Sequence, residues 1–401
     1  MITIFDLRAS TPQKFLDEIQ QFYNEPVRVE RFSDEEIKAC IGCWSCWLKT
    51  PGKCVFKDAL AEKYQAYMDS DTVILLMDTA QGFINHKAKA FFDRIIVLYH
   101  PYLVFKSGEF RHKRRYKSYP NMVFHFETDD LTPSEVQCIK AYLVRSADHY
   151  RSKAYILNRG KTLECTPLKK MKAQRGVLDF KETSPMKKLV VYNGSPRRTH
   201  SNSKRFLDVL SEKMGARIEV RDLKDYRQWD VWAKAFESDE NVMFFMPLYV
   251  HAMPSHVMDF MERLSPSKGS IAYFIQSGFP ESSQSHYLEA YFEVQSQKLD
   301  RVYLGTVIKG GVESLRFRPE KSQEKLIQQV YESVETLIET GSFDKIQVRR
   351  LSMPVRFGLM FYGMFKFMVF IGLFKGFWDK QLKANQAYEM RHDRPYKKSK
   401  G

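Results

Sequence analysis

The chain has 401 residues, which exceeds a typical single-core domain and favours two domains with an extension. Hydrophobic residues make up 44% of it and aromatic residues 14%, so packed cores are expected and a wholly disordered chain is excluded. The formal net charge of +15 favours polyanionic partners such as phosphorylated cofactors, anionic lipids or nucleic acid. Because no zinc-finger, helix-turn-helix or RNA-binding signature accompanies that charge, a nucleic-acid partner is not expected.

The first residues read MITIFDLRAS and lack the basic segment, apolar stretch and cleavage site of a secretory signal. We therefore expect a cytoplasmic protein whose six cysteines are reduced or metal-bound rather than paired in disulfides. Cys138 and Cys165 are isolated, and we expect them to be packing residues. The basic run RHKRRYK at 111–117 is interpreted as a solvated, charged loop.

Short apolar runs alternate with amphipathic stretches of helical length. Strands are expected at Ile2–Asp6, Val73–Met77, Met122–Phe126, Leu189–Tyr192, Val242–Met246, Ile271–Ile275 and Tyr303–Ile308, and helices at Lys204–Met214 and Lys321–Ile338. This alternation predicts parallel sheets with helices on both faces.

Four of the six cysteines form the pattern C-x2-C-x2-C-x7-C. Zinc sites usually present two C-x2-C pairs separated by a dozen or more residues. Three cysteines at successive x2 spacings instead suit a compact cluster, as in bacterial ferredoxins, and a turn at Pro51 and Gly52 would return the fourth. A 4Fe–4S cluster, a structural zinc and a metal-free loop all stay open. The candidate ligands are Cys40, Cys43, Cys46 and Cys54.

Two stretches align without a gap: VILLMDTAQGFINHKAKAFFDR at 73–94 and VMFFMPLYVHAMPSHVMDFMER at 242–263. Phe91 falls on Phe260, an offset of 169 positions, whereas the opening strands at Ile2 and Leu189 are 187 positions apart. The first half therefore carries 18 extra residues, the length of the segment Cys40–Lys57. We predict two copies of one α/β domain, with the cysteine segment in the first copy only.

The connection at 160–186 is rich in Lys, Thr and Pro and has no sustained periodicity, so we place the domain boundary there. The predicted ranges are 1–165, 186–345 and a basic, hydrophobic helical extension at 346–401.

After the strand Leu189–Tyr192 comes NGSPRRTHSNS, and the helix that follows ends at Gly215. Gly194 would permit close backbone approach, Arg197 would supply charge, and the helix N-terminus would face an anion. Taken alone, the stretch is equally compatible with a polar turn before a capped helix.

GSPR followed by SNS resembles the FMN phosphate loop of the flavodoxin-like NAD(P)H-dependent FMN reductase family. MPLYVHAMPSHVMDFMER is similar to the second flavin loop of that family, and QSGFPE at 276–281 is similar to the third. The resemblance implies two flavodoxin-like, doubly wound parallel-sheet domains in tandem. It implies FMN phosphate contacts from Ser195, Arg197, Ser201, Asn202 and Ser203, and ring contacts from Pro247, Tyr249, Val250, His251, Ser277, Gly278 and Phe279.

The first half differs at the equivalent positions. Its opening loop, LRASTPQK, has no glycine, and Asp78 stands where the second half has Pro247. A carboxylate there would repel an anionic flavin. We therefore predict that FMN binds only in the second half.

The cysteine pattern resembles that of the iron–sulfur flavoproteins, a branch of the same flavodoxin-like group. That resemblance implies a 4Fe–4S cluster, and it implies a homodimer or a fused pair in which a cluster serves a neighbouring flavin. This sequence departs from the branch, because its cysteines lie in the half without the phosphate loop.

The stretch FGLMFYGMFKFMVFIGLF, Phe357–Phe374, is interrupted only by Lys366 and is flanked by basic residues. Eighteen residues is near the minimum for a membrane span, and a central Lys costs about 2.5–3.5 kcal/mol. Docking onto the protein or a partner copy, peripheral contact with a membrane surface and true spanning all stay open.

The function expected from these features is that of a flavin-dependent oxidoreductase. It would pass electrons from NAD(P)H or another carrier, through FMN and a 4Fe–4S cluster, to a small-molecule or protein acceptor. No catalytic side chain is expected, because the flavin supplies the chemistry. The alternative is a non-catalytic FMN-binding or membrane-associated adaptor protein.

Overall fold

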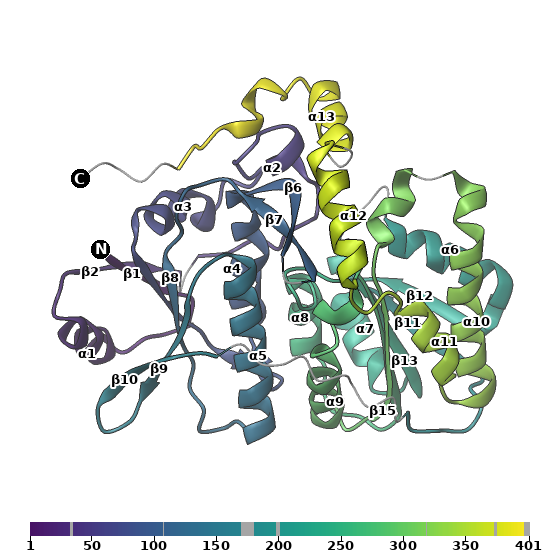
Figure 1. Ribbon diagram of the computed structural model, residues 1–401. Helices are drawn as coiled ribbons and strands as arrows, with labels where there is room; N and C mark the ends of the chain where they lie inside the picture. Colours follow the sequence, from purple (N-terminus) through teal and green to yellow (C-terminus); the bar gives the residue numbers. More distant parts are fainter. Residues whose placement is uncertain are drawn as a thin grey trace. The chain divides into compact units, whose positions relative to one another are not determined.

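The computed structural model describes residues 1–32, 35–106, 108–169, 180–197, 201–317, 319–372 and 375–396. The chain divides into two compact units (Figure 1). Unit 1 comprises Met1–Met171 together with Leu359–Gly401, and unit 2 comprises Lys172–Gly358. The C-terminal segment thus packs with the first part of the chain, although the whole of unit 2 separates them in sequence.

Unit 1 is built on a six-stranded sheet in the order β10-β9-β8-β3-β1-β2. Its strands are β1 (Ile2–Asp6), β2 (Val27–Arg31), β3 (Thr72–Leu76), β8 (Asn121–His125), β9 (Ala154–Arg159) and β10 (Leu163–Pro167). All neighbours pair in parallel except β10, which runs antiparallel to β9 at the edge. The five parallel strands follow the order 2-1-3-4-5 that is found in flavodoxin-like sheets.

Alternate side chains of β1 face opposite layers, as the two-residue period of a strand requires. Ile2 and Ile4 pack with Phe15 of α1 on one face. On the other face Phe5 contacts the rings of Tyr67 and Phe91. The helices of this unit are α1 (Gln13–Tyr23), α2 (Ser45–Leu48), α3 (Ala59–Asp69), α4 (His86–Arg94), α5 (Pro133–His149), α12 (Leu359–Phe370) and α13 (Lys375–Ala384).

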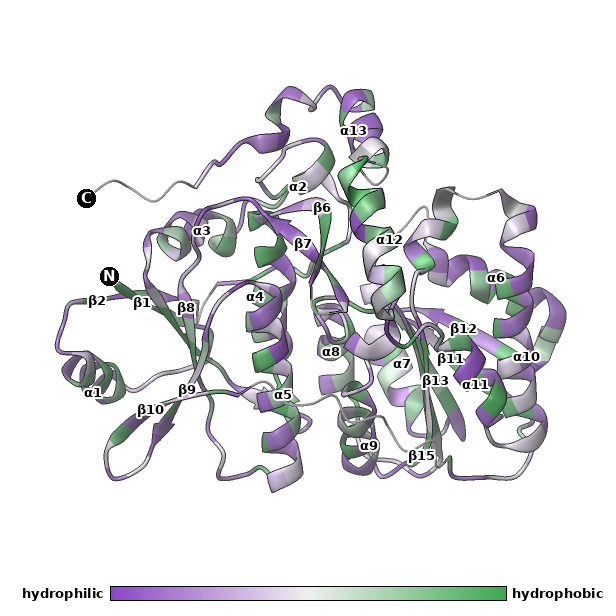
Figure 2. Cartoon of the chain, in the orientation of Figure 1, coloured by the Kyte–Doolittle hydropathy of each residue, from purple (hydrophilic) through white to green (hydrophobic). Residues whose placement is uncertain are grey.

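Two small antiparallel hairpins complete unit 1: β4 (Thr79–Ala80) with β5 (Phe83–Ile84), and β6 (Tyr99–Lys106) with β7 (Glu109–Arg114). Helix α12 packs on the second hairpin, where Phe365 contacts the rings of Phe105 and Phe110. Figure 2 shows the apolar character of α12. Among the residues that the structure describes, no helix is both long and apolar enough to cross a membrane.

Unit 2 contains a five-stranded, fully parallel sheet in the order β12-β11-β13-β14-β15, which is again 2-1-3-4-5. The strands are β11 (Leu189–Asn193), β12 (Ile218–Asp222), β13 (Asn241–Pro247), β14 (Ser270–Gln276) and β15 (Val302–Lys309). The helices are α6 (Asn202–Met214), α7 (Trp229–Phe236), α8 (Ser255–Glu262), α9 (Leu288–Lys298), α10 (Glu324–Thr340) and α11 (Lys345–Leu351).

Helices cover both faces of this sheet. Phe245 and Phe274 stack 4.2 Å apart on the face that also carries the apolar residues of α6, α10 and α11. On the opposite face Tyr273 stacks on Phe292 of α9 with ring centroids 4.1 Å apart. Because both faces are covered, the strands read as continuous apolar runs rather than alternating ones.

The seven predicted strands are confirmed to within one residue at each end. Strands β2, β9, β10 and β12 were not predicted, because partly buried or exposed positions interrupt their burial. Part of the predicted connection is in fact ordered, because Cys165 lies in β10 and accepts a hydrogen bond from Tyr23 Oη at 3.7 Å. Cys138 is buried on α5, as expected for a packing residue.

The interpretation of the basic run as a solvated loop was wrong. Its first residues belong to β7, and the side chains of Arg111, Arg115 and Tyr116 are buried. Arg111 forms an ion pair with Asp148 at 2.7 Å. Tertiary partners far along the chain therefore bury charges that the local sequence suggests are exposed.

Candidate functional site

The twelve residues predicted to contact FMN lie in three segments at the carboxyl ends of neighbouring strands of unit 2. One segment follows β11 and enters α6, the second follows β13 and enters α8, and the third follows β14. Ligands of doubly wound sheets bind at this edge. Residues 198–200 of the first loop lie outside the described residues.

The first loop is held by hydrogen bonds among its own polar groups. Ser195 N donates to Asn193 Oδ1 at 3.1 Å. Ser201 caps α6 by accepting from Lys204 N at 3.1 Å, and its hydroxyl donates to Ser195 Oγ at 2.8 Å. The hydroxyls predicted to contact phosphate therefore cluster at the N-terminus of a helix, where the helix dipole favours an anion.

Gly194 is explained by packing rather than by room for a ligand. A Cβ on this residue would lie 2.7 Å from Met246 Cβ and 2.8 Å from Val257 Cγ2. The loop thus runs so close to β13 and α8 that a side chain cannot fit between them.

Arg197 forms an ion pair with Glu313, with Arg197 Nη1 2.9 Å from Glu313 Oε1. The two side chains are 13% and 29% exposed, so this cation is only partly solvated. Glu313 was not predicted from the sequence, because it lies 116 residues away in the segment after β15. Its carboxylate engages the charge that the resemblance assigns to the FMN phosphate.

Hydrogen bonds join the first loop to the third segment and to the segment after β15. Ser203 Oγ accepts a hydrogen bond from Gln276 Nε2, and Asn202 Nδ2 donates to the carbonyl of Val312 at 2.9 Å. Val312 N in turn donates to the carbonyl of Ser277 at 3.0 Å. Gln276 Oε1 is buried and has no hydrogen-bond partner among the described residues.

The second loop contains a tight turn in an unusual conformation. Tyr249 and Ala252 exchange backbone hydrogen bonds at 2.9 and 3.0 Å, and the two residues between them have positive φ angles. These are Val250 at 38° and His251 at 64°. A β-branched residue at positive φ is strained.

The aligned turn in unit 1 places Gln81 and Gly82 at the same offset of 169 positions, with φ angles of 49° and 74°. Glycine adopts such an angle without steric cost, whereas histidine does not. Unit 2 thus holds two large side chains in a turn that would be less strained with glycine. Strain of this kind clusters at binding sites, where the side chain has a use that offsets it.

The third segment, Ser277, Gly278 and Phe279, is fixed to the segment after β15. Ser277 N donates to the carbonyl of Lys309 at 2.9 Å, and Ser277 Oγ donates to the carbonyl of Phe279 at 2.9 Å. A Cβ on Gly278 would be in ordinary contact with Glu313, at 3.5 Å from its Cβ. The third segment and the acidic partner of Arg197 are therefore neighbours.

In unit 1 the equivalent of the phosphate loop already carries an anion of its own. Ala9 N donates a hydrogen bond to Asp78 Oδ2 at 2.8 Å. Asp78 aligns with Pro247 at the offset of 169. A carboxylate of the chain thus engages a backbone N–H of this loop, which supports the prediction that FMN does not bind there.

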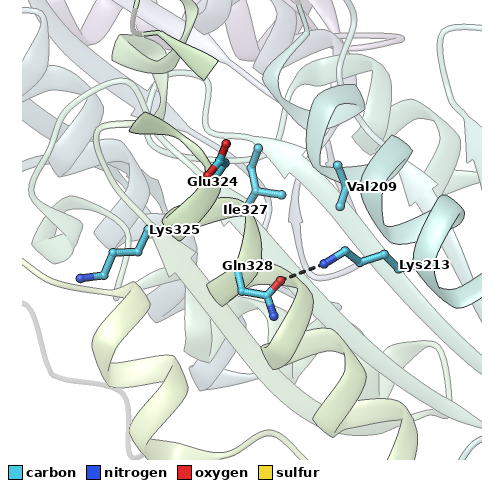
Figure 3. Close-up of a pocket in the computed structure, with 6 residues that line it drawn as sticks. All are labelled: Val209, Lys213, Glu324, Lys325, Ile327 and Gln328. Atoms are coloured by element: carbon cyan, nitrogen blue, oxygen red, sulfur yellow. Dashed lines mark hydrogen bonds between the residues drawn. The ribbon is translucent and has the colours of Figure 1, made fainter. Parts of the chain in front are cut away.

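A separate surface pocket of about 560 Å³ lies between α6 and α10 (Figure 3). Lys213 Nζ donates to Gln328 Oε1 at 2.9 Å within it. The lining residues are Val209, Lys213, Glu324, Lys325, Ile327 and Gln328. None of them is among the residues predicted to contact FMN.

The cysteine segment is the connection between β2 and α3 in unit 1. Trp44, at φ 60°, precedes the short helix α2, and Gly52 N donates to the carbonyl of Cys46 at 2.9 Å. This turn directs the chain back before Cys54, as the sequence predicts. All four cysteines are free thiols, of which Cys43 is exposed.

The four thiols lie close enough to influence one another electrostatically. Burial raises the pKa of Cys40 to about 12, and Asp93, Cys54 and Cys43 contribute. Burial likewise raises the pKa of Cys46 well above its usual value, whereas Arg115 opposes that rise. Deprotonation of these thiols thus requires a compensating positive charge, such as a metal centre.

Among the described residues, no group of three or more His, Cys, Asp or Glu side chains is arranged so that it could hold a metal ion. A single zinc would draw its sulfur ligands to about 2.3 Å from one point. A 4Fe–4S cluster takes each thiolate on a different iron, so its four ligands surround a larger body. The iron–sulfur ligand set therefore remains a prediction.

Two buried arginines adjoin the cysteine segment. Arg94 Nη2 donates to Cys54 Sγ at 3.5 Å and also pairs with Asp58. Burial alone would raise the pKa of Asp58, but the hydrogen bonds from Arg94 outweigh it and hold that pKa below its usual value. Arg115, the second arginine, acts electrostatically on Cys46. The surroundings of these thiols thus contain two buried guanidinium groups, of which Arg94 is paired with Asp58.

No protein-family model matches the sequence, and no curated protein matches it significantly. Similar solved structures include an NADPH-quinone reductase from P. pentosaceus, at 12% identity over 37% of this chain and 96% of that one, with a TM-score of 0.29. An FMN-dependent NADH-azoreductase from Bacillus anthracis in complex with FMN has 16% identity over 38% of this chain and 100% of that one, with a TM-score of 0.30. General stress protein 14 from Treponema denticola, in complex with FMN, has 15% identity over 38% of this chain and 99% of that one, with a TM-score of 0.31. The strand order 2-1-3-4-5 by itself identifies the doubly wound arrangement of both sheets.

Proposed function

We propose that the chain is a flavin-dependent oxidoreductase made of two flavodoxin-like domains in tandem, with FMN bound by unit 2. The observation that carries this proposal is the convergence of the first and third predicted flavin loops with the segment after β15. Hydrogen bonds link Ser203 to Gln276 and Asn202 to Val312, so the segments after β11, β14 and β15 meet at one edge of the sheet. Strand order alone supports a doubly wound fold, but this convergence supports a ligand site.

The chemistry of these residues suits a phosphate ester. Ser195, Ser201 and Ser203 supply hydroxyls at the N-terminus of α6, and Arg197 supplies a positive charge. Ser201 donates to Ser195 and Arg197 pairs with Glu313, so a phosphate that engages Arg197 would compete with Glu313. When bound, FMN would accept a hydride from NAD(P)H and return electrons singly.

The strained turn would hold Val250 and His251 against the flavin ring. Tyr287, which immediately precedes α9, donates a hydrogen bond from its Oη to the carbonyl of His251 and so holds the turn in place. With the turn anchored in this way, its two side chains would be positioned before the ligand arrives. That preorganisation would lower the entropic cost of binding.

We further propose that Cys40, Cys43, Cys46 and Cys54 hold a 4Fe–4S cluster. Four thiols within one short loop would supply the ligands. The buried Arg115 next to them has N–H groups without a partner among the described residues, which suits a site for an anionic group. Such a cluster would accept and release single electrons. A structural zinc and a metal-free loop are the alternative outcomes.

One anaerobic experiment tests both cofactors. The purified protein is assayed for flavin absorbance, FMN uptake, iron, zinc and sulfide, and is then mixed with NADH or NADPH. Bleaching of bound flavin supports an enzyme. A colourless protein that takes up no FMN refutes the flavin proposal, and zinc without sulfide refutes the cluster alone.

A second candidate function is binding to an anionic membrane surface through α12. Met360, Phe367 and Phe370 of this helix are 91%, 62% and 87% exposed, and basic residues flank it. Apolar side chains beside positive charge are typical of interfacial helices. We expect sedimentation with phosphatidylserine vesicles that is lost in the pair Phe367→Ser and Phe370→Ser. Retained sedimentation in that pair, or none in the wild type, refutes this candidate.

A further inference from the structure

Arg115 is a buried guanidinium whose hydrogen-bonding capacity is only partly used. Arg115 is 1% exposed. Nη1 donates to the carbonyls of Arg391 at 3.3 Å and Asp393 at 2.8 Å, whereas Nε and Nη2 are buried without a partner among the described residues. In the described part of the chain no carboxylate forms an ion pair with it.

Such a group is costly to the fold. A charge removed from water destabilises a protein unless an opposite charge and hydrogen-bond acceptors replace the lost hydration. Donors of a buried arginine that have no partner among the described residues are therefore suited to an anionic group beside them.

The cysteine loop adjoins Arg115 and could supply that anionic group. The stem of Arg115 lies against the turn of the loop, since a Cβ on Gly52 would be 3.5 Å from Arg115 Cδ. Gly52 N is in turn bonded to the carbonyl of Cys46. Arg94 already pairs with Asp58. Arg115 has no ion pair among the described residues, although Asp393 acts on it electrostatically.

The end of the chain holds Arg115 in this position. We call residues 388–396 the C-terminal strap. Arg394 Nε donates to the carbonyl of Arg115 at 2.7 Å, and Tyr396 N donates to Tyr116 Oη at 3.1 Å. Pro395 packs on Gly52, where a Cβ would approach its Cδ to 2.8 Å. The strap therefore contacts both Arg115 and the cysteine loop.

We propose that Arg115 is the counter-charge of the anionic centre formed by Cys40, Cys43, Cys46 and Cys54, and that the C-terminal strap clamps it there and shields the centre from water. This inference rests on the proposed iron–sulfur cluster. Arg115 acts as a positioning residue rather than a ligand. Because reduction by one electron adds negative charge to the centre, a buried cation beside it favours the reduced state.

The test uses the full-length chain, reconstituted anaerobically with iron and sulfide and reduced with dithionite. Arg115→Met removes the charge while keeping much of the side-chain volume. At a fixed potential we expect it to lower the ratio of reduced to oxidised cluster at least tenfold, a shift of 59 mV for one electron. Arg111→Met is the matched control, because Arg111 is also buried in unit 1 but pairs with Asp148.

Shielding by the strap is measured separately, as the rate at which a chelator removes iron. Tyr396→Ala removes a ring that lies 5.4 Å from that of Tyr64. We expect at least tenfold faster iron release with little change in the circular dichroism spectrum. If Arg115→Met does not fold, Arg115→Gln takes its place, because an amide retains donors without the charge.

The outcomes separate the two proposals. A wild-type chain that takes up no iron and sulfide refutes the cluster and this inference with it. If the wild type holds a cluster and the neutral variants of Arg115 match the Arg111→Met control in potential, the cluster stands and the role of Arg115 is refuted. Iron release unchanged in Tyr396→Ala refutes shielding by the strap.

Discussion

The ion pair between Arg197 and Glu313 makes a quantitative prediction about FMN affinity. Glu313→Gln removes the carboxylate that lies 2.9 Å from Arg197 Nη1 while preserving the shape of the side chain. A hydrogen bond between charged groups is worth about 1.5–3 kcal/mol, and partial exposure of this pair reduces the figure to roughly 1–2 kcal/mol. FMN would no longer need to displace Glu313, so its affinity should rise roughly 5- to 30-fold.

The assay is titration of apoprotein with FMN, followed by the loss of flavin fluorescence. Glu237→Gln is a matched control, because it changes the net charge equally and removes a surface ion pair with Lys234. The gain should shrink as salt is added, since screening weakens partly exposed ion pairs. An affinity equal to or weaker than that of the control would show that Glu313 does not compete with the phosphate.

Three further predictions concern single residues. His251→Gly should stabilise unit 2 by about 1 kcal/mol, because residue 251 has a positive φ angle that glycine adopts more easily. The same variant should bind FMN more weakly. Urea unfolding measures the stability and titration measures the FMN affinity, and an affinity equal to that of the wild type would refute a contact between His251 and the ring. Gly194→Ala should destabilise unit 2 by about 1–3 kcal/mol through overpacking, whereas Gly278→Ala, which has ordinary contact space, should cost little in the same thermal melts. Burial lowers the pKa of His100 to about 3, and Arg115 contributes to this shift. The unfolded chain therefore binds a proton at His100 more readily than the folded chain does. The stability that neutral His100 contributes is lost as the pH falls from about 6.5 toward 3. His100→Gln should therefore flatten the decline in unfolding free energy between pH 7 and pH 5, and an unchanged slope would contradict the assignment.

Much of the fold was predictable from local patterns. Strands such as β1 and β14 are mostly apolar and are buried along their whole length, because both faces of each sheet are covered. The repeat was visible in sequence, and its aligned elements begin together: α4 starts at His86 and α8 at Ser255, at the offset of 169. Edge strands such as β2 and β12 were missed, because partial exposure interrupts their apolar pattern.

The candidate site was predictable only in part, because local patterns do not show which distant residues folding brings together. The sequence indicated the three loops, since each follows a recognisable strand and carries short polar motifs. It did not indicate that Glu313 would pair with Arg197, nor that Gly194 is required by packing against Met246. Local sequence does not identify a partner that lies 116 positions further along the chain.

What the sequence by itself determined is the alternation of strands and helices, the polar loops and the compact cysteine motif, because these depend on periodicity and spacing over a few residues. Only the tertiary structure decided that Arg115 is buried against the carbonyls of Arg391 and Asp393, which lie 276 and 278 positions further along the chain. The basic run gives no sign of this, since burial of a charge depends on groups that folding brings from distant parts of the chain. The electrostatic surroundings of the cysteines are thus a property of the fold, whereas the cysteines themselves are a property of the sequence.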